Sequence, residues 1–163
     1  MPAEASPTRS ERFTGKWAWL FPISYLVHIA EEYWGGFPSW IARFWGVESS
    51  LNNFLSWNGG AWVVMTLGVA VALKTKSYRW LLVSFATVVL INGVVHALAS
   101  VLTRSYSPGL ISGLLLFVPL GIVSLRRARR QVNARTFRAG VILGVVMHGA
   151  VVLLAFGFAR LAA

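Results

Sequence analysis

Cysteine is absent from the 163 residues, and acidic residues are scarce, with five against fifteen lysines and arginines. The absence of cysteine excludes disulfide bonds, thiolate metal ligands and cysteine nucleophiles. Charged residues make up only 12% of the chain, well below the roughly 25% that is usual in soluble domains, while 56% of the residues are hydrophobic. The composition therefore predicts an integral membrane protein.

Five apolar stretches approach the ~20 residues that a helix needs to cross a bilayer. We predict membrane spans over residues 17–33, 57–73, 80–102, 109–125 and 139–158. None of them shows the two-residue alternation of a membrane β-barrel strand, and helices are the other structure that satisfies the backbone in lipid. The expected fold is an all-α polytopic helix bundle, a single transmembrane domain over 15–163 that follows a disordered cytoplasmic tail over 1–14.

The long connection between the first two spans carries large apolar side chains among polar ones. Trp40, Phe44, Trp45 and Leu51 are spaced between serines, asparagines and charged residues. This mixture is typical of a helix that lies in the membrane interface. We expect such an interfacial amphipathic helix at about 38–55, with a lid over a buried site as the alternative role.

The net charge of +10 is concentrated at alternate ends of the spans. Lysine and arginine gather in the N-terminal tail and in the loops 74–79 and 126–138, whereas Arg43 and Arg104 are alone in the intervening loops. The positive-inside rule then places the N-terminus in the cytoplasm and the C-terminus outside. We expect a multi-pass protein of the plasma membrane, and the charge gives no reason to expect a nucleic-acid partner.

The predicted spans contain an unusual set of ionisable residues. All three histidines of the chain fall within them, as His28, His96 and His148, and Glu31 and Glu32 stand together in "YLVHIAEEYWGG". An ionisable residue at the centre of a membrane helix costs about 2.5–3.5 kcal/mol on insertion scales, so such residues usually face the bundle interior and mark function. Three helices contributing such groups predict a buried site.

Helical geometry shows which of these groups share a face. Glu31 and Glu32 lie at about −60° and +40° from His28 around the helix axis. Asn92 and His96, in "INGVVH", are four residues apart and also share a face. These two clusters, with the histidine of the last span, all fall in the middle or outer half of the membrane when depth is counted at ~1.5 Å per residue from the basic ends. They are placed to converge.

Three further residues complete the candidate set. His148 follows Gly140 and Gly144 at four-residue intervals, and small residues let a neighbouring helix approach closely, so His148 is expected to point into a helix contact. Asn58 and Ser112 fall near the same outer mouth and are candidates for contacting substrate or ligands. A helix N-cap for Asn58 and simple packing for Ser112 are the more ordinary interpretations.

Imidazoles and carboxylates together suit a divalent metal. Catalytic zinc takes three protein ligands, typically histidine and glutamate, plus water, and non-haem iron takes two histidines and one carboxylate. We predict His28, Glu32, His96 and His148 as metal ligands, with zinc preferred to iron. Glu31, Glu32 and Asn92 are the predicted catalytic residues: one glutamate completes the ligand set, the other acts as general base or orienting group, and Asn92 hydrogen-bonds a ligand or the substrate.

The sequence resembles the HXXEE family of small membrane proteins. "HIAEE" in the first span, "NGVVH" in the third and the histidine of the last span carry the resemblance, which runs from about residue 20 to 150. Residue by residue it implies the positions His28, Glu31, Glu32, Asn92 and His96, with His148 added by its placement. The resemblance implies the position of a site and leaves the reaction open.

These observations favour a metal-dependent membrane enzyme that acts on a lipidic substrate, with hydrolysis as the first choice of reaction and iron-dependent oxidation as the second. A small transporter coupled to protons or cations is the main alternative, because Asp, Glu and His chains also carry protons in membranes. Axial haem ligation by two histidines and a purely structural polar cluster are further alternatives. The expected partners are the bilayer and the substrate, and homo-oligomerisation stays open.

Overall fold

The computed structural model describes residues 15–75 and 78–161, with side chains described as far as residue 154. The predicted tail over 1–14 lies outside these residues. The described chain folds into helices and connecting loops without a β-strand, which confirms the all-α prediction. The elements are η1 (Lys16–Trp19), α1 (Leu20–Trp34), α2 (Phe37–Trp45), α3 (Leu51–Thr75), α4 (Arg79–Thr103), α5 (Leu110–Ser112), η2 (Gly113–Phe117), α6 (Val118–Gln131) and α7 (Ala134–Leu161).

Four helical segments of the described chain are long and apolar enough to cross a membrane: 51–75, 79–103, 110–131 and 134–154. They correspond to the second to fifth predicted spans and indicate a membrane protein. The first predicted span, residues 17–33, is not among these four. Its α-helical part α1 has only 15 residues and is about 22 Å long. Only together with the 3₁₀ turn η1 does it reach about 30 Å, the thickness of the hydrocarbon core.

The predicted interfacial helix is present as α2 but is shorter than expected. It ends at Trp45 because Gly46 adopts a left-handed conformation with φ +65°, which interrupts helical hydrogen bonding. The α3 helix then begins at Leu51, where the Ser50 hydroxyl accepts a hydrogen bond from the Asn53 backbone N–H at 3.1 Å. Residues 51–55, predicted as part of the interfacial helix, therefore belong to α3.

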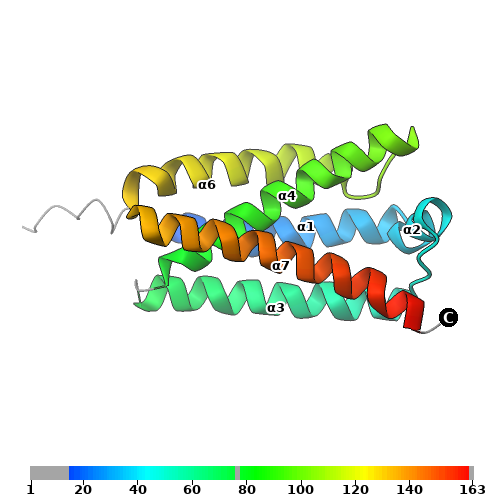
Figure 1. The fold of residues 1–163 in the computed structure, drawn as a ribbon, viewed down its shortest axis with the longest axis horizontal. Helices are drawn as coiled ribbons and strands as arrows, with labels where there is room; N and C mark the ends of the chain where they lie inside the picture. Colours follow the sequence, from blue (N-terminus) through cyan, green and yellow to red (C-terminus); the bar gives the residue numbers. More distant parts are fainter. Residues whose placement is uncertain (1–14, 76–77, 162–163) are drawn as a thin grey trace, which may run out of the picture.

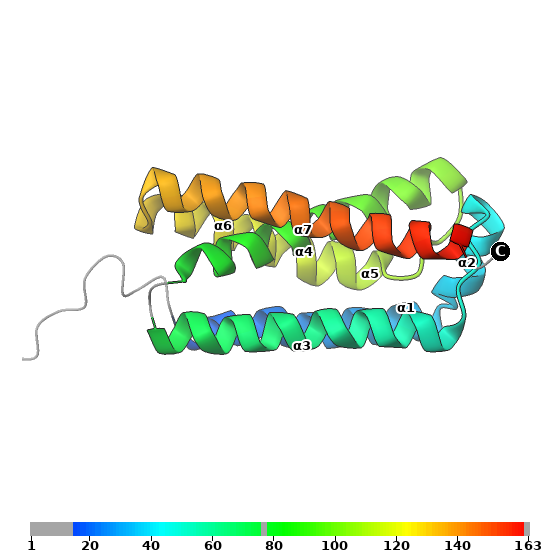
Figure 2. The same cartoon turned by 60° about the horizontal axis from the view of Figure 1, so that its bottom comes forward.

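The α4 helix lies at the centre of the bundle and packs against α3, α6, α7 and η2 (Figures 1 and 2). Its contact with α7 depends on the small residues that the sequence places there. A Cβ at Gly140 would lie 2.5 Å from Val83 Cβ, and one at Gly144 would lie 2.6 Å from Thr87 Cβ. Glycine thus lets α7 approach α4 closely. The sequence predicted a close helix contact at these glycines, and the structure identifies the partner.

A second close helix crossing joins α4 to the segment that contains α5, η2 and α6. Gly93 contacts Gly113: a Cβ added to Gly93 would lie 2.6 Å from the Gly113 carbonyl oxygen. The segment is locally wound as a π-helix over η2, a feature that is frequent at functional sites. This crossing brings the start of α5 next to the outer part of α4.

The helix ends that carry basic residues lie together at one end of the bundle. Figure 1 places the start of α1, the end of α3, the start of α4 and the junction of α6 with α7 at its left, and α2 with the junction of α4 and α5 at its right. The described part of the chain thus has a strongly basic end and an opposite end covered by α2. The His and Glu residues of α1 and α4 lie in the half toward α2.

Candidate metal centre

Three of the predicted ligands meet in the interior of the bundle. His28 and Glu32 are four residues apart on one face of α1, and His96 faces them from α4. The Glu32 Oε1 atom lies 3.6 Å from His28 Nε2 and 3.4 Å from His96 Nε2. The exposed fractions of these residues are 0% for His28 and 5% each for Glu32 and His96. The possible ligand atoms of the three residues lie within 4.8 Å of one another.

Each histidine is held by a serine on its other ring nitrogen. His28 Nδ1 lies 2.8 Å from the Ser112 hydroxyl, and His96 Nδ1 lies 3.0 Å from the Ser107 hydroxyl. We assign Nδ1 as the protonated nitrogen in both rings, because a serine oxygen can accept a hydrogen bond from that N–H group. The Nε2 lone pairs then point toward Glu32. Metal-binding histidines commonly have such a partner, which sets their tautomer and orientation.

Glu31 has a different function from its neighbour Glu32. Its Oε1 accepts hydrogen bonds from the Tyr106 hydroxyl at 2.6 Å and from the Ile111 backbone N–H at 2.8 Å. Its Oε2 accepts one from the Ser112 backbone N–H at 2.6 Å. The carboxylate thus satisfies the first N–H groups of the helix that begins at α5. It fixes Ser112, which in turn holds His28.

Tyr106 lies outside the spanning segments, in the loop between α4 and α5. Partial burial, and after it the hydrogen bond to Glu31, raise the pKa of Tyr106 to about 12. The phenol therefore remains protonated at neutral pH and donates to Glu31. The loop is attached to α1 by this contact.

Tight packing of rings and backbone surrounds the two imidazoles. A Cβ at Gly109, whose φ is +98°, would lie 2.7 Å from Cε1 of both His28 and His96. Phe117 packs on the His28 ring with centroids 4.4 Å apart, and Phe37 of α2 packs near the His96 ring at 5.8 Å. Because cores are close-packed, these contacts leave each imidazole little rotational freedom. The Nε2 atoms are preorganised toward Glu32.

The cluster borders a cavity of about 700 Å³ between α1, α2, α3, α4 and α7. His28, Glu32 and His96 line part of its wall, and most of the remaining lining comes from aromatic and aliphatic residues. Those that define its apolar wall are Phe37, Trp40, Ile41, Trp45, Phe54, Trp57, Val64, Val95, Val151, Val152 and Leu154. A largely apolar pocket of this size with a few convergent polar groups is typical of a small-molecule site.

The remaining predicted site residues are placed around this cavity. His148 lines it from α7 but is not part of the three-residue ligand group. Asn92 also lines it, one turn before His96, and its Oδ1 atom is buried without a hydrogen-bond partner in the described chain. Asn58 is not the N-cap of α3, which Ser50 provides; its Oδ1 accepts a hydrogen bond from Tyr25 at 2.9 Å. Ser112 contacts His28 and has more than a packing role.

Sequence reasoning missed three residues that shape the site: Ser107, Gly109 and Tyr106. All three lie in the loop between α4 and α5. A serine or a glycine in a loop has no periodicity to reveal it, and loop conformation depends on tertiary contacts. The available signal was the "SPG" sequence, which indicates a turn directly before the helix that carries Ser112.

The donor set fits a divalent metal ion. Tetrahedral zinc ligands at 2.0–2.1 Å from the ion are about 3.4 Å apart, close to the 3.4 and 3.6 Å that separate Glu32 Oε1 from the two Nε2 atoms. His28 Nε2 is buried and has no hydrogen-bond partner in the described chain, and such an atom is costly unless it is satisfied. The group of His28, Glu32 and His96 could therefore hold a metal ion.

Fold and site together define a class: a small α-helical membrane protein with a buried His–Glu–His cluster that could bind a metal. Within this class the chain belongs to a family described as proteins of unknown function with an HXXEE motif, whose pattern matches residues 19–124. This match includes the whole cluster and both serines but not His148. No curated protein and no solved structure matches the chain.

Proposed function

We propose that the protein is a metal-dependent membrane enzyme that acts on a lipidic substrate, with hydrolysis as its reaction and zinc as the preferred metal. One observation carries the proposal. Three buried ligand atoms from His28, Glu32 and His96 converge at the wall of a largely apolar cavity. Catalytic metal sites keep a coordination position open beyond three protein ligands, and the cavity beside the cluster would give a substrate access to a metal held there.

The ligand set also matches the two-histidine, one-carboxylate arrangement of non-haem iron, so iron-dependent oxidation is the second choice of reaction. When bound, a divalent ion at this site would polarise a substrate oxygen and make a coordinated water more acidic. Ser107 and Ser112 orient the two imidazoles for this task. Glu31 acts through Ser112 as a positioning residue, because its two oxygens are already engaged by three donors.

The cavity suggests roles for two more residues. We propose that Asn92, with its unpartnered Oδ1, accepts a hydrogen bond from the substrate or from water. Beyond the ligands, the titratable side chains that line the cavity in the described chain are Tyr25, Glu48 and His148. Of these, only an imidazole ordinarily titrates near neutral pH, which makes His148 our candidate for proton transfer. The sequence analysis predicted a different role for His148, that of a fourth metal ligand.

The lipidic substrate is inferred from the lining of the cavity. Aromatic residues of α2 and α3 and the aliphatic residues Val151, Val152 and Leu154 of α7 face the space beside the cluster. Burial of an acyl or prenyl chain against them is favourable in proportion to its apolar area. A membrane lipid can reach the site without crossing water, since the helices around it are themselves in the bilayer.

We place the protein in the plasma membrane, with its basic end in the cytoplasm and the metal centre in the outer half. The support is the gathering of the described basic helix ends at one end of the bundle (Figure 1) and the positive-inside rule. His96 lies 17 residues beyond Arg79 along α4, which corresponds to about 25 Å of helix. The N-terminus is then cytoplasmic and the C-terminus external.

Elemental analysis of detergent-purified protein tests the metal centre. We expect near-stoichiometric zinc or iron in the wild type and in His148→Ala, and loss of the metal in Glu32→Gln and in His96→Ala. The identity of the metal then decides between hydrolysis and oxidation. No metal in the wild type after reconstitution with either ion would remove the basis of the proposal and favour a proton-coupled carrier.

Lipid turnover tests the enzymatic part. Metal-loaded wild-type protein and Glu32→Gln are incubated with a total membrane lipid extract, and the lipids are compared by mass spectrometry. We expect one lipid class to be consumed by the wild type alone. A metal-loaded protein that changes no lipid, but carries protons or metal ions into liposomes, would identify a transporter.

A further inference from the structure

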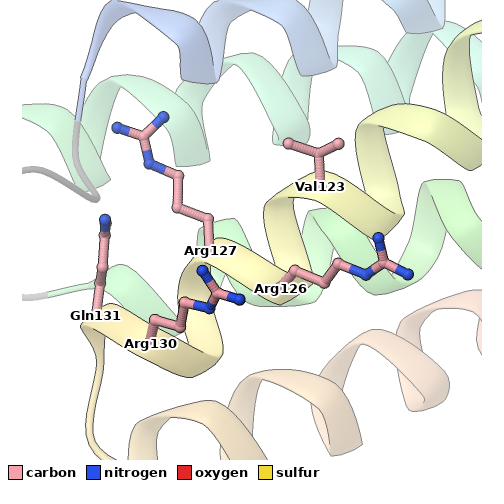
Figure 3. Close-up of a pocket in the computed structure, with 5 residues that line it drawn as sticks. All are labelled: Val123, Arg126, Arg127, Arg130 and Gln131. Atoms are coloured by element: carbon pink, nitrogen blue, oxygen red, sulfur yellow. The ribbon is translucent and has the colours of Figure 1, made fainter.

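A second hollow lies at the opposite end of the molecule from the metal centre. It has a volume of about 310 Å³ and is lined by Val123, Arg126, Arg127, Arg130 and Gln131 of α6. The four residues from Val123 to Arg130 follow the spacing i, i+3, i+4 and i+7, which places them on one face of the helix. Figure 3 shows the side chains of Arg126 and Arg130 extending along α6 in the same direction.

Arg126 and Arg130 have no carboxylate near them among the residues that the structure describes. The acidic residues in the described part of the chain are Glu31 and Glu32, at the far end of α1, and Glu48, between α2 and α3. The end of α1 and the connection from α2 to α3, which carry these residues, lie toward the α2 end of the bundle, whereas the last turns of α6, which line the hollow, lie at the opposite end (Figure 1). Arg127 turns away from its two neighbours and lies over the Trp17 ring, 5.5 Å from its centroid. Arg126 and Arg130 thus concentrate positive charge in the hollow.

The positive-inside rule alone does not explain this arrangement, because it requires basic residues at the inner ends of spans and sets no face for them. We propose that the hollow binds the headgroup of an anionic phospholipid from the surrounding leaflet. Guanidinium groups bind phosphate through two parallel hydrogen bonds. Basic residues at the cytoplasmic boundary of membrane helices are the usual recognition elements for anionic lipids.

The apolar part of the hollow indicates a lipid rather than free phosphate. Val123 is 61% exposed and lies one turn from Arg126 toward the membrane centre. An acyl chain whose phosphate contacts Arg126 and Arg130 would run along Val123. The ligand is therefore an amphiphile with its charge at the membrane surface, as in phosphatidylglycerol.

The hollow is tested with purified full-length protein in detergent, titrated with phosphatidylglycerol, phosphatidylcholine or inorganic phosphate while thermal stability is followed. The test variant is Arg126→Gln/Arg130→Gln. The matched control is Arg129→Gln/Arg135→Gln, which removes the same charge from the same end of the bundle without changing the lining. Both pairs are exposed, so each variant is expected to fold, which its melting curve in phosphatidylcholine verifies.

We expect phosphatidylglycerol alone to stabilise the wild type, with an affinity that falls as salt is added. The test variant should bind at least roughly 10-fold more weakly, because the charge-assisted hydrogen bonds of two guanidinium groups to the phosphate are lost. The control keeps these hydrogen bonds and should lose less affinity than the test variant. If both variants lost the same affinity for phosphatidylglycerol, binding would depend only on the general positive charge of the surface, and the proposal would be overturned.

Two other results would also overturn it. Equal stabilisation by inorganic phosphate would assign the hollow to a soluble anion. In the second, the wild type shows no preference for phosphatidylglycerol, while the variant Glu4→Gln/Glu11→Gln does. That result would assign the hollow to acidic residues of the N-terminal tail.

Discussion

Glu31 and Glu32 are adjacent in the chain, but their carboxylates contact different partners. Glu32 faces His28 and His96, whereas Glu31 accepts hydrogen bonds from the backbone at Ile111 and Ser112. The 100° step between neighbouring residues of a helix is enough to direct one carboxylate into the metal centre and the other to the start of α5. The double glutamate of the motif is thus one candidate metal ligand and one anchor.

The two glutamates are predicted to differ when each is changed to glutamine. Glu32→Gln should lose the bound metal, because a neutral amide replaces the only carboxylate of the ligand group. Glu31→Gln should keep it and lower the free energy of unfolding by about 1 kcal/mol, since charge-assisted hydrogen bonds become neutral ones. Metal content and thermal unfolding, measured on both variants, check this. If Glu31→Gln lost the metal and Glu32→Gln retained it, the roles of the two glutamates would be the reverse of those assigned.

The serines behind the histidines are predicted to control metal affinity. Ser107→Ala and Ser112→Ala should each weaken binding by about 10- to 100-fold, the usual cost of removing a partner of a metal-binding histidine. Ser124→Ala is the control, because Ser124 is buried in α6 and its hydroxyl has no partner in the described chain. Competition with a chromophoric chelator measures the affinities. Unchanged affinity in both test variants would show that the serines do not orient the ligands.

Gly109→Ala is predicted to disrupt the metal centre by steric contact. The added methyl group would lie 2.7 Å from both imidazoles, on a residue whose φ is +98°. Gly36→Ala is the matched control: Gly36 has φ +72° and nothing within 4 Å of its added Cβ, so it carries only the backbone penalty of about 1–2 kcal/mol. Metal content and melting temperature separate the two effects. A Gly109→Ala variant that binds metal like Gly36→Ala would contradict the observed packing.

The orientation in the membrane is predicted to place α2 outside and the α6–α7 junction in the cytoplasm. The absence of cysteine allows single cysteines to be introduced without background labelling. Arg43→Cys should react with a membrane-impermeant maleimide in intact cells, and Ala134→Cys only after permeabilisation. Both positions are exposed in the structure. The reverse labelling pattern would invert the proposed topology and move the metal centre to the inner half of the bilayer.

The sequence by itself determined the membrane environment, the helices and the residue types of the candidate site. Long apolar stretches predict membrane helices because every backbone polar group must be satisfied within the segment in lipid. Ionisable residues in those stretches are costly enough to indicate a buried cluster. Glycines at four-residue intervals correctly predicted that α7 makes a close helix contact, and the structure shows that its partner is α4. These inferences depend on local chemistry and periodicity, which one helix carries without its neighbours.

Only the tertiary structure decided which of the polar residues meet. The 3.6-residue period places His28, Glu31 and Glu32 on one face within about 100°, but the partner of each depends on where α4 and α5 pack. The crossing at Gly93 and Gly113 brings Ser112 to His28, and the loop between α4 and α5 brings Ser107 to His96. Helix crossings and loop conformations are long-range properties, so no pattern within one helix reveals them.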